Sequence, residues 1–336
     1  MGEAPQFLKF ALREVTEAAA RAACQWIGRG AQGDARKINQ AAVTAMRNAF
    51  ASIPIKGQIA IGDGSDATDQ RAAFANGEIV GDANAELAYD IAVDPVEGTS
   101  FLMRGMTNAM AVLALAPKDT MLRTGPAFYM EKFVGPPAVR GKIDPLAPLE
   151  DKLAIIAHET GKNISDLIIY VLEKPRHRHL IENIQHCGAR VAQYPAGDIA
   201  GAIMAARSDS GIDAMIGTGG TPEGIISACA IRALGGEFLT RYDPQLPSEH
   251  IAVREAGIST EDWMSIDHLV SSNNVYFVAT GITTGLLFDG IERLPDYERT
   301  ESLLISGETG EYSTLTSYHK LTGVESGIES GAELWP

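Results

Sequence analysis

The sequence contains few cysteines, and they are not spaced for pairing or metal binding. Its 336 residues include only three, Cys24, Cys187 and Cys229, far apart in the chain and without Cys-x-x-Cys spacing. Disulfide-stabilised domains and structural zinc sites need more cysteines, closer together. The sequence therefore predicts neither, and it fits a reducing compartment.

Positive charge and long apolar runs are also scarce. The 28 Lys and Arg residues are outnumbered by 43 Asp and Glu, which gives a net charge of −15. Nucleic acid binding depends on clustered cations, so nucleic acid is excluded as the main partner, whereas a few local cations can still hold a small phosphorylated molecule. No apolar run approaches the roughly 20 residues of a membrane helix. The N-terminal residues lack the basic and then apolar pattern of a secretion signal. We therefore expect a cytoplasmic protein without a membrane partner.

The apolar residues that are present, 45% of the chain, suffice for one large layered domain or for two domains. Hydrophobic periodicity predicts helices over residues 10–26, 37–50, 149–160, 178–187, 198–207 and 223–234. Short apolar runs predict strands over residues 58–61, 91–93, 109–116, 167–172, 189–194, 213–216 and 275–279. In the second half these elements alternate, which is typical of a mostly parallel sheet covered on both faces.

A proline-rich segment divides the chain. Residues 134–150 contain four prolines and two glycines, a composition that favours a long connection. We therefore expect an N-terminal α/β domain over residues 1–140 and a C-terminal doubly wound α/β domain over residues 141–322. The acidic residues 323–336 are expected to form a flexible tail.

Three predicted strands end in segments rich in glycine and acids. These are GDGSD after Ile61, DPVEGT after Val93 and GTGGTPEG after Ile216. Open α/β sheets bind ligands at the carboxyl ends of their strands, although Gly, Asp and Pro also form ordinary turns. The three segments are therefore candidate parts of one site.

The segment DPVEGT carries the strongest chemical signal. Asp94 and Glu97 are three residues apart across a proline, so both carboxylates can face one point, as a hard divalent cation requires. The Thr99 hydroxyl and the backbone N–H at Gly98 could contact an oxyanion. Glu223 begins a predicted helix after a glycine-rich loop. It is either part of an anion or metal site there or a first-turn acid that favours the helix dipole.

A basic cluster, residues 174–179 (KPRHRH), follows the strand predicted over residues 167–172. Such clusters are commonly solvated charge runs. Its position at a strand end fits the capture of a sugar phosphate equally well, with Arg176 as a planar clamp. His177 and His179 are not assigned as ligands.

Longer stretches of the chain resemble the class II fructose-1,6-bisphosphatase family, including its fructose-1,6-/sedoheptulose-1,7-bisphosphatase members. The similar stretches are EVTEAAARAACQWIGRG, QAAVTAMR, QIAIGDG, DIAVDPVEGT, GPAFYMEKFVGPPAVRGKID, EKPRH, GTGGTPEGIISACAIRALGG and ATGITTGLLFDGI. They occur in family order over almost the whole chain. DPVEGT alone is shared by a wider group of metal-dependent sugar and inositol phosphatases, whereas the other stretches are specific to this family.

The resemblance implies a layered α-β-α-β-α sugar-phosphatase fold, a homo-oligomer, and a Mg²⁺- or Mn²⁺-dependent phosphatase of carbohydrate metabolism. The substrate would be a sugar bisphosphate such as fructose 1,6-bisphosphate or sedoheptulose 1,7-bisphosphate. The implied metal-ligand positions are Asp63, Asp94, Glu97 and Glu223, and the implied catalytic positions are Asp94, Glu97 and Thr99. The implied sugar-phosphate contacts are Glu97, Gly98, Thr99, Tyr129, Lys174, Pro175, Arg176, Asp198 and Gly220.

The first third of the chain departs from the family pattern. Asn39 lies where the family has a metal-binding Asp, and Ala67 lies where it has an acid that helps to activate water. Asn offers a metal only a neutral carbonyl oxygen, and Ala offers nothing. Asp34, Asp66 or Asp69 could replace the missing carboxylates. Three interpretations remain: a phosphatase with altered specificity or metal content, an authentic bisphosphatase with replaced ligands, or a weak or inactive relative that binds a sugar phosphate as a sensor or partner subunit.

Overall fold

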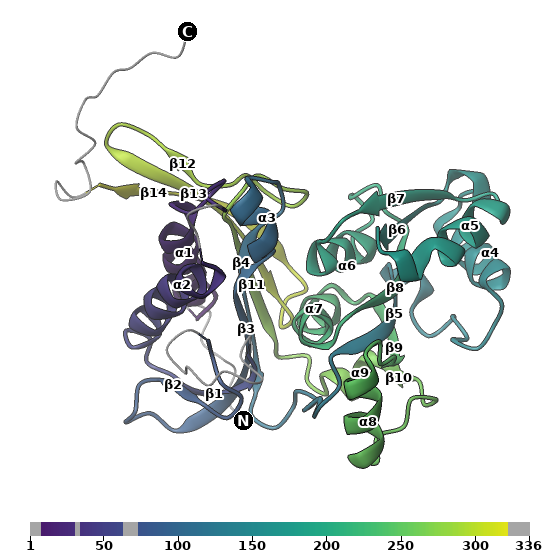
Figure 1. Ribbon diagram of the computed structural model, residues 1–336, viewed down its shortest axis with the longest axis horizontal. Helices are drawn as coiled ribbons and strands as arrows, with labels where there is room; N and C mark the ends of the chain where they lie inside the picture. Colours follow the sequence, from purple (N-terminus) through teal and green to yellow (C-terminus); the bar gives the residue numbers. More distant parts are fainter. Residues whose placement is uncertain (1–7, 31–33, 63–72, 322–336) are drawn as a thin grey trace, which may run out of the picture.

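Two mixed β-sheets, with helices outside and between them, make up the fold (Figure 1). The computed structural model describes residues 8–30, 34–62 and 73–321. Within these residues the helices are α1 (Leu8–Cys24), α2 (Ala35–Phe50), α3 (Thr99–Arg104), α4 (Leu149–Thr160), α5 (Arg178–His186), α6 (Asp198–Ala206), α7 (Thr221–Leu234), α8 (Pro247–Glu255) and α9 (Ile266–Leu269). The strands are β1 (Lys56–Ile61), β2 (Ile79–Gly81), β3 (Leu87–Glu97), β4 (Met110–Pro117), β5 (Tyr129–Gly135), β6 (Ile168–Leu172), β7 (Arg190–Tyr194), β8 (Ala214–Gly220), β9 (Glu237–Tyr242), β10 (Met264–Ser265), β11 (Tyr276–Gly281), β12 (Glu292–Arg293), β13 (Tyr297–Ser306) and β14 (Tyr312–Lys320).

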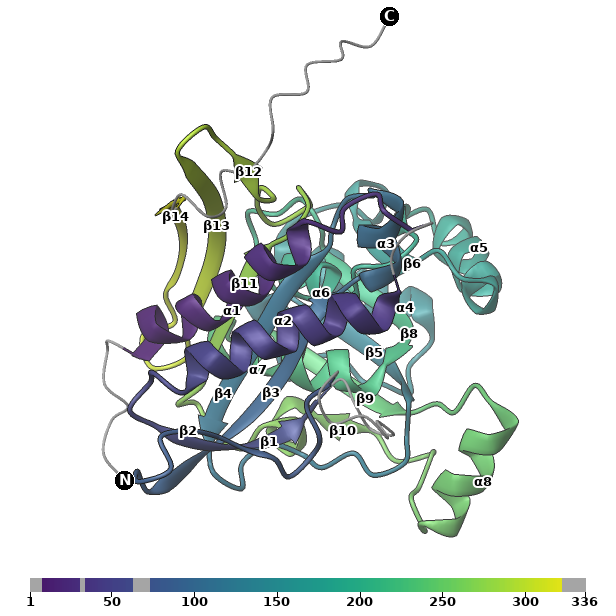
Figure 2. The same ribbon diagram turned by 60° about the vertical axis from the view of Figure 1, so that its left-hand side comes forward.

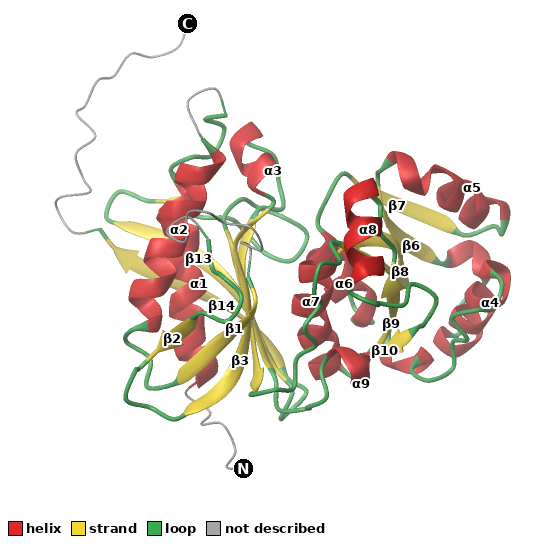
Figure 3. Ribbon diagram, turned by 60° about the horizontal axis from the view of Figure 1, so that its bottom comes forward, coloured by secondary structure: helices red, strands yellow, loops and turns green. Residues whose placement is uncertain are grey.

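The layers follow the order helix, sheet, helix, sheet, helix. Helices α1 and α2 lie side by side on the outer face of the first sheet (Figure 2). Helices α6 and α7 lie between the two sheets (Figure 3), and α4 and α5 cover the outer face of the second sheet. This arrangement confirms the α/β fold class and its predicted layers.

Both faces of β3 are covered around residues 91–93, which explains why these three residues form an uninterrupted apolar run. Ile91 and Val93 pack into the core beneath α1 and α2. Ala92, on the opposite face, packs into the core that α6 and α7 share with the two sheets. The strand therefore belongs to two of the hydrophobic cores, and packing on both faces fixes its carboxyl end.

The second sheet is mixed, so the prediction of a mostly parallel sheet is wrong. Strand β6 is parallel to β7 and β8, but β5 is antiparallel to both β8 and β9, and β10 is antiparallel to β9. Strand β5 was not predicted from periodicity, because Glu131 and Lys132 interrupt its apolar sequence.

The two sheets do not follow the division expected at residue 140. Strand β5, which precedes that residue, belongs to the second sheet, whereas β11, β13 and β14 return to the first sheet. Strand β11 pairs with both β4 and β13, so distant parts of the sequence form one sheet. The expected tail, residues 323–336, lies outside the described residues.

Two further observations concern the cysteines and the possibility of a membrane helix. The three cysteines are free. In the part of the chain that the structure describes, no helix has both the length and the apolar character needed to cross a membrane.

Candidate active site

A cleft of about 730 Å³ lies where the carboxyl ends of several strands meet. The ends of β1 and β3 from the first sheet and of β6 and β8 from the second sheet contribute to its lining. Asn39 of α2 also lines it. Gly62 and the segments after Val93 and Ile216 that the sequence marked as candidates therefore reach a common cleft, at the strand ends where α/β sheets bind ligands.

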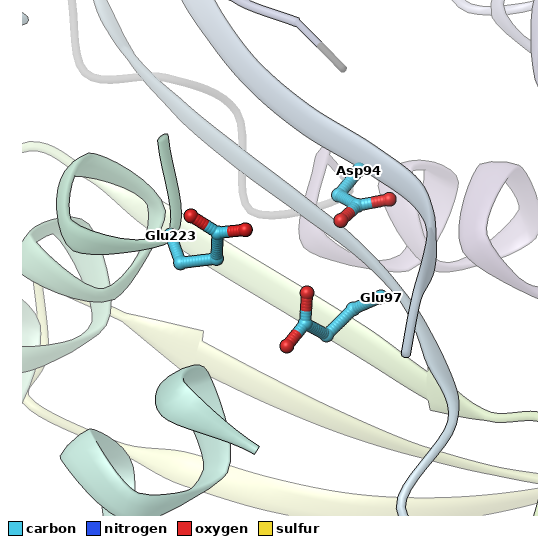
Figure 4. Close-up of side chains that lie close together, drawn as sticks. All are labelled: Asp94, Glu97 and Glu223. Atoms are coloured by element: carbon cyan, nitrogen blue, oxygen red, sulfur yellow. The ribbon is translucent and has the colours of Figure 1, made fainter. Parts of the chain in front are cut away.

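Three carboxylates converge on one side of this cleft (Figure 4). Asp94, Glu97 and Glu223 each place a carboxylate oxygen within 4.8 Å of the others. Burial raises the pKa of Glu97 well above its usual range, and the neighbouring Glu223 and Asp94 charges raise it further. Three desolvated acids this close repel one another, and a divalent cation with oxygen ligands removes that repulsion. The donor set therefore suits a hard divalent cation.

A β-bulge brings Asp94 and Glu97 to the same side of β3. The strand does not end at Val93, as predicted, but continues through Asp94 to Glu97. In a regular strand, residues three apart point to opposite faces. Here Asp94 pairs with Val112 and Glu97 with Met110, so β3 contains one extra residue against β4. The bulge reverses the alternation, and it also accommodates Pro95, which has no N–H for the sheet.

Glycine turns the chain from β3 into α3. Gly98 has a φ of 82°, in the left-handed region, and precedes the first helical residue, Thr99. The Thr99 hydroxyl donates a hydrogen bond of 2.8 Å to the Val96 carbonyl, and the side chain lines the cleft. The bulge and the turn together hold the segment DPVEGT in one defined conformation.

Two consecutive glycines allow carboxylates to lie against the end of β8. A Cβ atom on Gly220 would overlap the Glu223 carboxylate, and one on Gly219 would overlap the Asp198 carboxylate. Oε2 of Glu223 and Oδ1 of Asp198 are buried and have no hydrogen-bond partner among the described residues. Buried acceptors of this kind are costly unless a ligand or ion satisfies them. The site thus has unused acceptors on both Glu223 and Asp198.

Comparison with known proteins identifies the family. Residues 6–319 match the family model described as bacterial fructose-1,6-bisphosphatase, glpX-encoded. The chain belongs to this family. It is 40% identical over 320 residues to "Fructose-1,6-bisphosphatase class 2" of Haemophilus influenzae, with 91% of this chain and 94% of that protein covered. It is 39% identical over 320 residues to "Fructose-1,6-bisphosphatase 1 class 2" of Escherichia coli, with 91% and 93% covered. The resemblance found in the sequence is confirmed.

The basic cluster of this class II bisphosphatase family member divides into two parts. Lys174 and Arg176 line the cleft together with Tyr129. Arg176 donates hydrogen bonds from Nε and Nη2 to the Thr218 carbonyl, at 3.1 and 2.7 Å, and its guanidinium lies 5.2 Å from the centre of the Tyr129 ring. Two of its donors are thus already used to fix the plane of the guanidinium. In contrast, His177 is buried, and its ring nitrogens form hydrogen bonds with the Leu172 carbonyl and the Thr218 N–H.

Some of the remaining candidates line the cleft and others do not. Asp198 and Gly220 line the cleft, whereas Gly98 and Pro175 are not among its lining residues. Asp34 caps the start of α2 by accepting the Arg36 N–H at 3.0 Å, and it does not line the cleft. The candidates Asp63, Asp66, Ala67 and Asp69 lie outside the described residues.

Sequence reasoning missed one charged residue beside the site. Lys132 of β5 is 1% exposed, and its Nζ donates hydrogen bonds to Asp198 Oδ2 at 2.5 Å and to the Gly220 carbonyl at 2.7 Å. Burial raises the pKa of Glu223, and the Lys132 ammonium opposes that rise. The available signal was its spacing: Lys132 alternates with Met130 and Val134, both fully buried, on one face of a strand. A lysine on such a face needs a partner.

Proposed function

We propose that this protein hydrolyses a phosphate monoester of a sugar bisphosphate, such as fructose 1,6-bisphosphate or sedoheptulose 1,7-bisphosphate. Membership of the class II fructose-1,6-bisphosphatase family supports the reaction and the substrate class. The observation that carries the proposal is the cluster of Asp94, Glu97 and Glu223 in a cleft that also contains Lys174 and Arg176. An acidic group and a basic group in one cleft suit a metal-dependent reaction on a doubly phosphorylated molecule.

Asp94, Glu97 and Glu223 would hold the divalent cation, Mg²⁺ or Mn²⁺. The cation supplies positive charge against the phosphoryl oxygens and makes water a better nucleophile. The protein's own contribution is to fix the three carboxylates before substrate arrives, so that little reorganisation is needed during the reaction. The Thr99 hydroxyl, at the start of α3, would contact the reacting phosphate by turning its proton away from the Val96 carbonyl.

The second phosphate binds at the basic side of the cleft. Arg176 is held in plane by the Thr218 carbonyl and by the Tyr129 ring, so its remaining donors are oriented before a phosphate binds. Lys174 adds a second positive charge. Asp198 accepts a hydrogen bond from a sugar hydroxyl through its unpartnered oxygen Oδ1. Together these groups favour a phosphorylated sugar over a simple phosphate ester.

A second candidate function is binding of a sugar phosphate without appreciable hydrolysis. The observation that favours it is Asn39, which lines the cleft at a position where the resemblance implies a metal-binding Asp. A neutral ligand there weakens one part of a cation site. The protein would then act as a sensor or partner subunit. The homo-oligomeric state and the cytoplasmic location stay predictions.

Phosphate release from a panel of sugar mono- and bisphosphates, with Mg²⁺ or Mn²⁺, tests the proposal. We expect turnover of a bisphosphate that depends on the cation, and a loss of at least a hundredfold in kcat for Glu97→Gln. Glu150→Gln, an exposed residue of α4, is the matched control and should retain wild-type activity. Binding without turnover on any substrate would favour the second candidate. Full activity in Glu97→Gln would contradict the assigned cation site.

A further inference from the structure

Lys132 is a buried cation in direct contact with the candidate active site. Its ammonium contacts one carboxylate, Asp198, and one carbonyl, Gly220, and almost none of it reaches solvent. Burying an ammonium group is costly unless opposite charge and hydrogen bonds compensate it. A position with this cost in the middle of an otherwise apolar strand face needs a reason beyond packing.

The two partners of Lys132 belong to different parts of the cleft. Asp198 is the first residue of α6, and it is assigned above to the sugar. Gly220 ends β8 and precedes the first turn of α7, which carries Glu223. A single ammonium group therefore connects the proposed sugar side of the cleft to the helix that supplies a proposed cation ligand.

The contacts also determine which oxygens remain available. Lys132 occupies Asp198 Oδ2 and leaves the buried oxygen Oδ1 without a partner. Its bond to the Gly220 carbonyl fixes the backbone at the point where the Glu223 carboxylate lies against the chain.

We propose that Lys132 is a positioning residue of this site, which holds Asp198 toward the sugar and the start of α7 toward the cation. It contacts neither substrate nor cation and acts through Asp198 and Gly220. This inference rests on the proposed function, because it assigns Lys132 a part in the same reaction.

The test is a double-mutant cycle with Lys132→Met, Asp198→Asn and the double variant. Kinetics with fructose 1,6-bisphosphate and Mn²⁺ give kcat and KM, and thermal unfolding gives stability. We expect Lys132→Met to raise KM at least tenfold and to lower kcat to a smaller extent. The double variant should be less impaired than the two single effects combined, because both changes remove the Lys132–Asp198 pair. It also removes both charges, so it should fold where Lys132→Met leaves Asp198 uncompensated.

Lys162 provides a matched control at the opposite end of β8. Its Nζ donates a hydrogen bond of 2.6 Å to Asp213, a buried acid immediately before that strand. Lys162→Met breaks a Lys–Asp pair of similar length away from the cleft, in which the lysine side chain is 40% exposed and the acid is buried. It should lower the melting temperature while kcat and KM remain within twofold of wild type.

The outcomes separate this inference from the proposed function. Unchanged kcat and KM in Lys132→Met, or fully additive effects that follow the loss of melting temperature, would overturn the positioning role while the phosphatase assignment stands. Absence of turnover in the wild type would overturn the phosphatase assignment. In that case the affinity for fructose 1,6-bisphosphate, measured by calorimetry, replaces KM, and an equal affinity in wild type and Lys132→Met overturns the positioning role.

Discussion

Gly220 lets the Glu223 carboxylate lie against the chain where β8 becomes α7. Its φ of −66° is accessible to any residue, so the requirement for glycine at this position comes from space and not from backbone strain. The group that a methyl would displace is the end of a flexible side chain. Substitution of Gly220 should therefore impair cation binding more than it lowers the free energy of unfolding.

We expect Gly220→Ala to displace the Glu223 carboxylate and to reduce cation affinity and kcat at least tenfold. The change in the free energy of unfolding should stay near 1 kcal/mol, because only a flexible carboxylate has to move. Calorimetry with Mn²⁺, phosphate release and urea denaturation give the three quantities. Wild-type cation affinity in a folded Gly220→Ala variant would show that Glu223 is not a ligand.

Among the described residues, Asn39 is the departure from the family pattern that lines the cleft. Asn39→Asp adds a carboxylate to a cleft that already contains Asp94, Glu97 and Glu223. We expect tighter Mn²⁺ binding and a lower melting temperature in the presence of a chelator, because a further negative charge increases the repulsion that the cation relieves. Asn48→Asp, on the exposed surface of the same helix, is the control. Weaker Mn²⁺ binding in Asn39→Asp would indicate that the site is built around the amide.

At the scale of elements, His177 joins the turn after β6 to β8. In its neutral form Nδ1–H donates to the Leu172 carbonyl at 2.7 Å, and Nε2 accepts the Thr218 N–H at 2.8 Å. Burial lowers the pKa of His177. A second proton would place a donor against the Thr218 N–H, so the neutral ring is the form that fits.

This arrangement makes stability depend on pH in a defined direction. Because the folded state disfavours the proton, the unfolded chain binds it first, near its ordinary pKa of about 6.5. The contribution of His177 is therefore complete above that value and is lost as the pH falls below it toward the lowered folded-state pKa. We expect the free energy of unfolding, from urea titrations between pH 7.5 and roughly 5, to fall less steeply in His177→Gln than in wild type. The exposed His250→Gln should keep the wild-type slope, and an unchanged slope in His177→Gln would contradict the role of the neutral ring.

The elements also show what sequence could and could not predict about the site. Asp94 and Glu97 were identified because an ordinary turn does not need two acids, and Glu223 was identified because it follows a glycine-rich segment. The bulge that turns both β3 carboxylates to one side was not predicted, because a proline such as Pro95 after an apolar run usually indicates that the strand has ended. Lys132 was missed because its partners, Asp198 and Gly220, are distant in the sequence and nothing local indicates them.

At the scale of the whole molecule, the sheets are assembled from distant segments. Local sequence patterns predicted α4, α5, α6 and α7 at nearly their observed positions, because the signal for a helix lies within one short segment. It could not predict that β11 inserts between β4 and β13, since strand pairing depends on long-range contacts that leave no local pattern. The result is a site whose acids come from β3 in one sheet and from α7, the helix that packs against both sheets.

That arrangement predicts that the cation stabilises the entire fold. Glu97 and Glu223 come from elements far apart in the sequence, and in the absence of the cation their charges repel. A cation that binds only the folded state adds about 2.7 kcal/mol at a concentration one hundred times its Kd. We expect Mn²⁺ to raise the melting temperature of the wild type by several degrees and a chelator to reverse the rise. Glu97→Gln should melt at a higher temperature than the chelator-treated wild type, because one repelling charge is gone, yet gain nothing from Mn²⁺. A rise with Mn²⁺ as large in Glu97→Gln as in the wild type would place the cation elsewhere in the molecule.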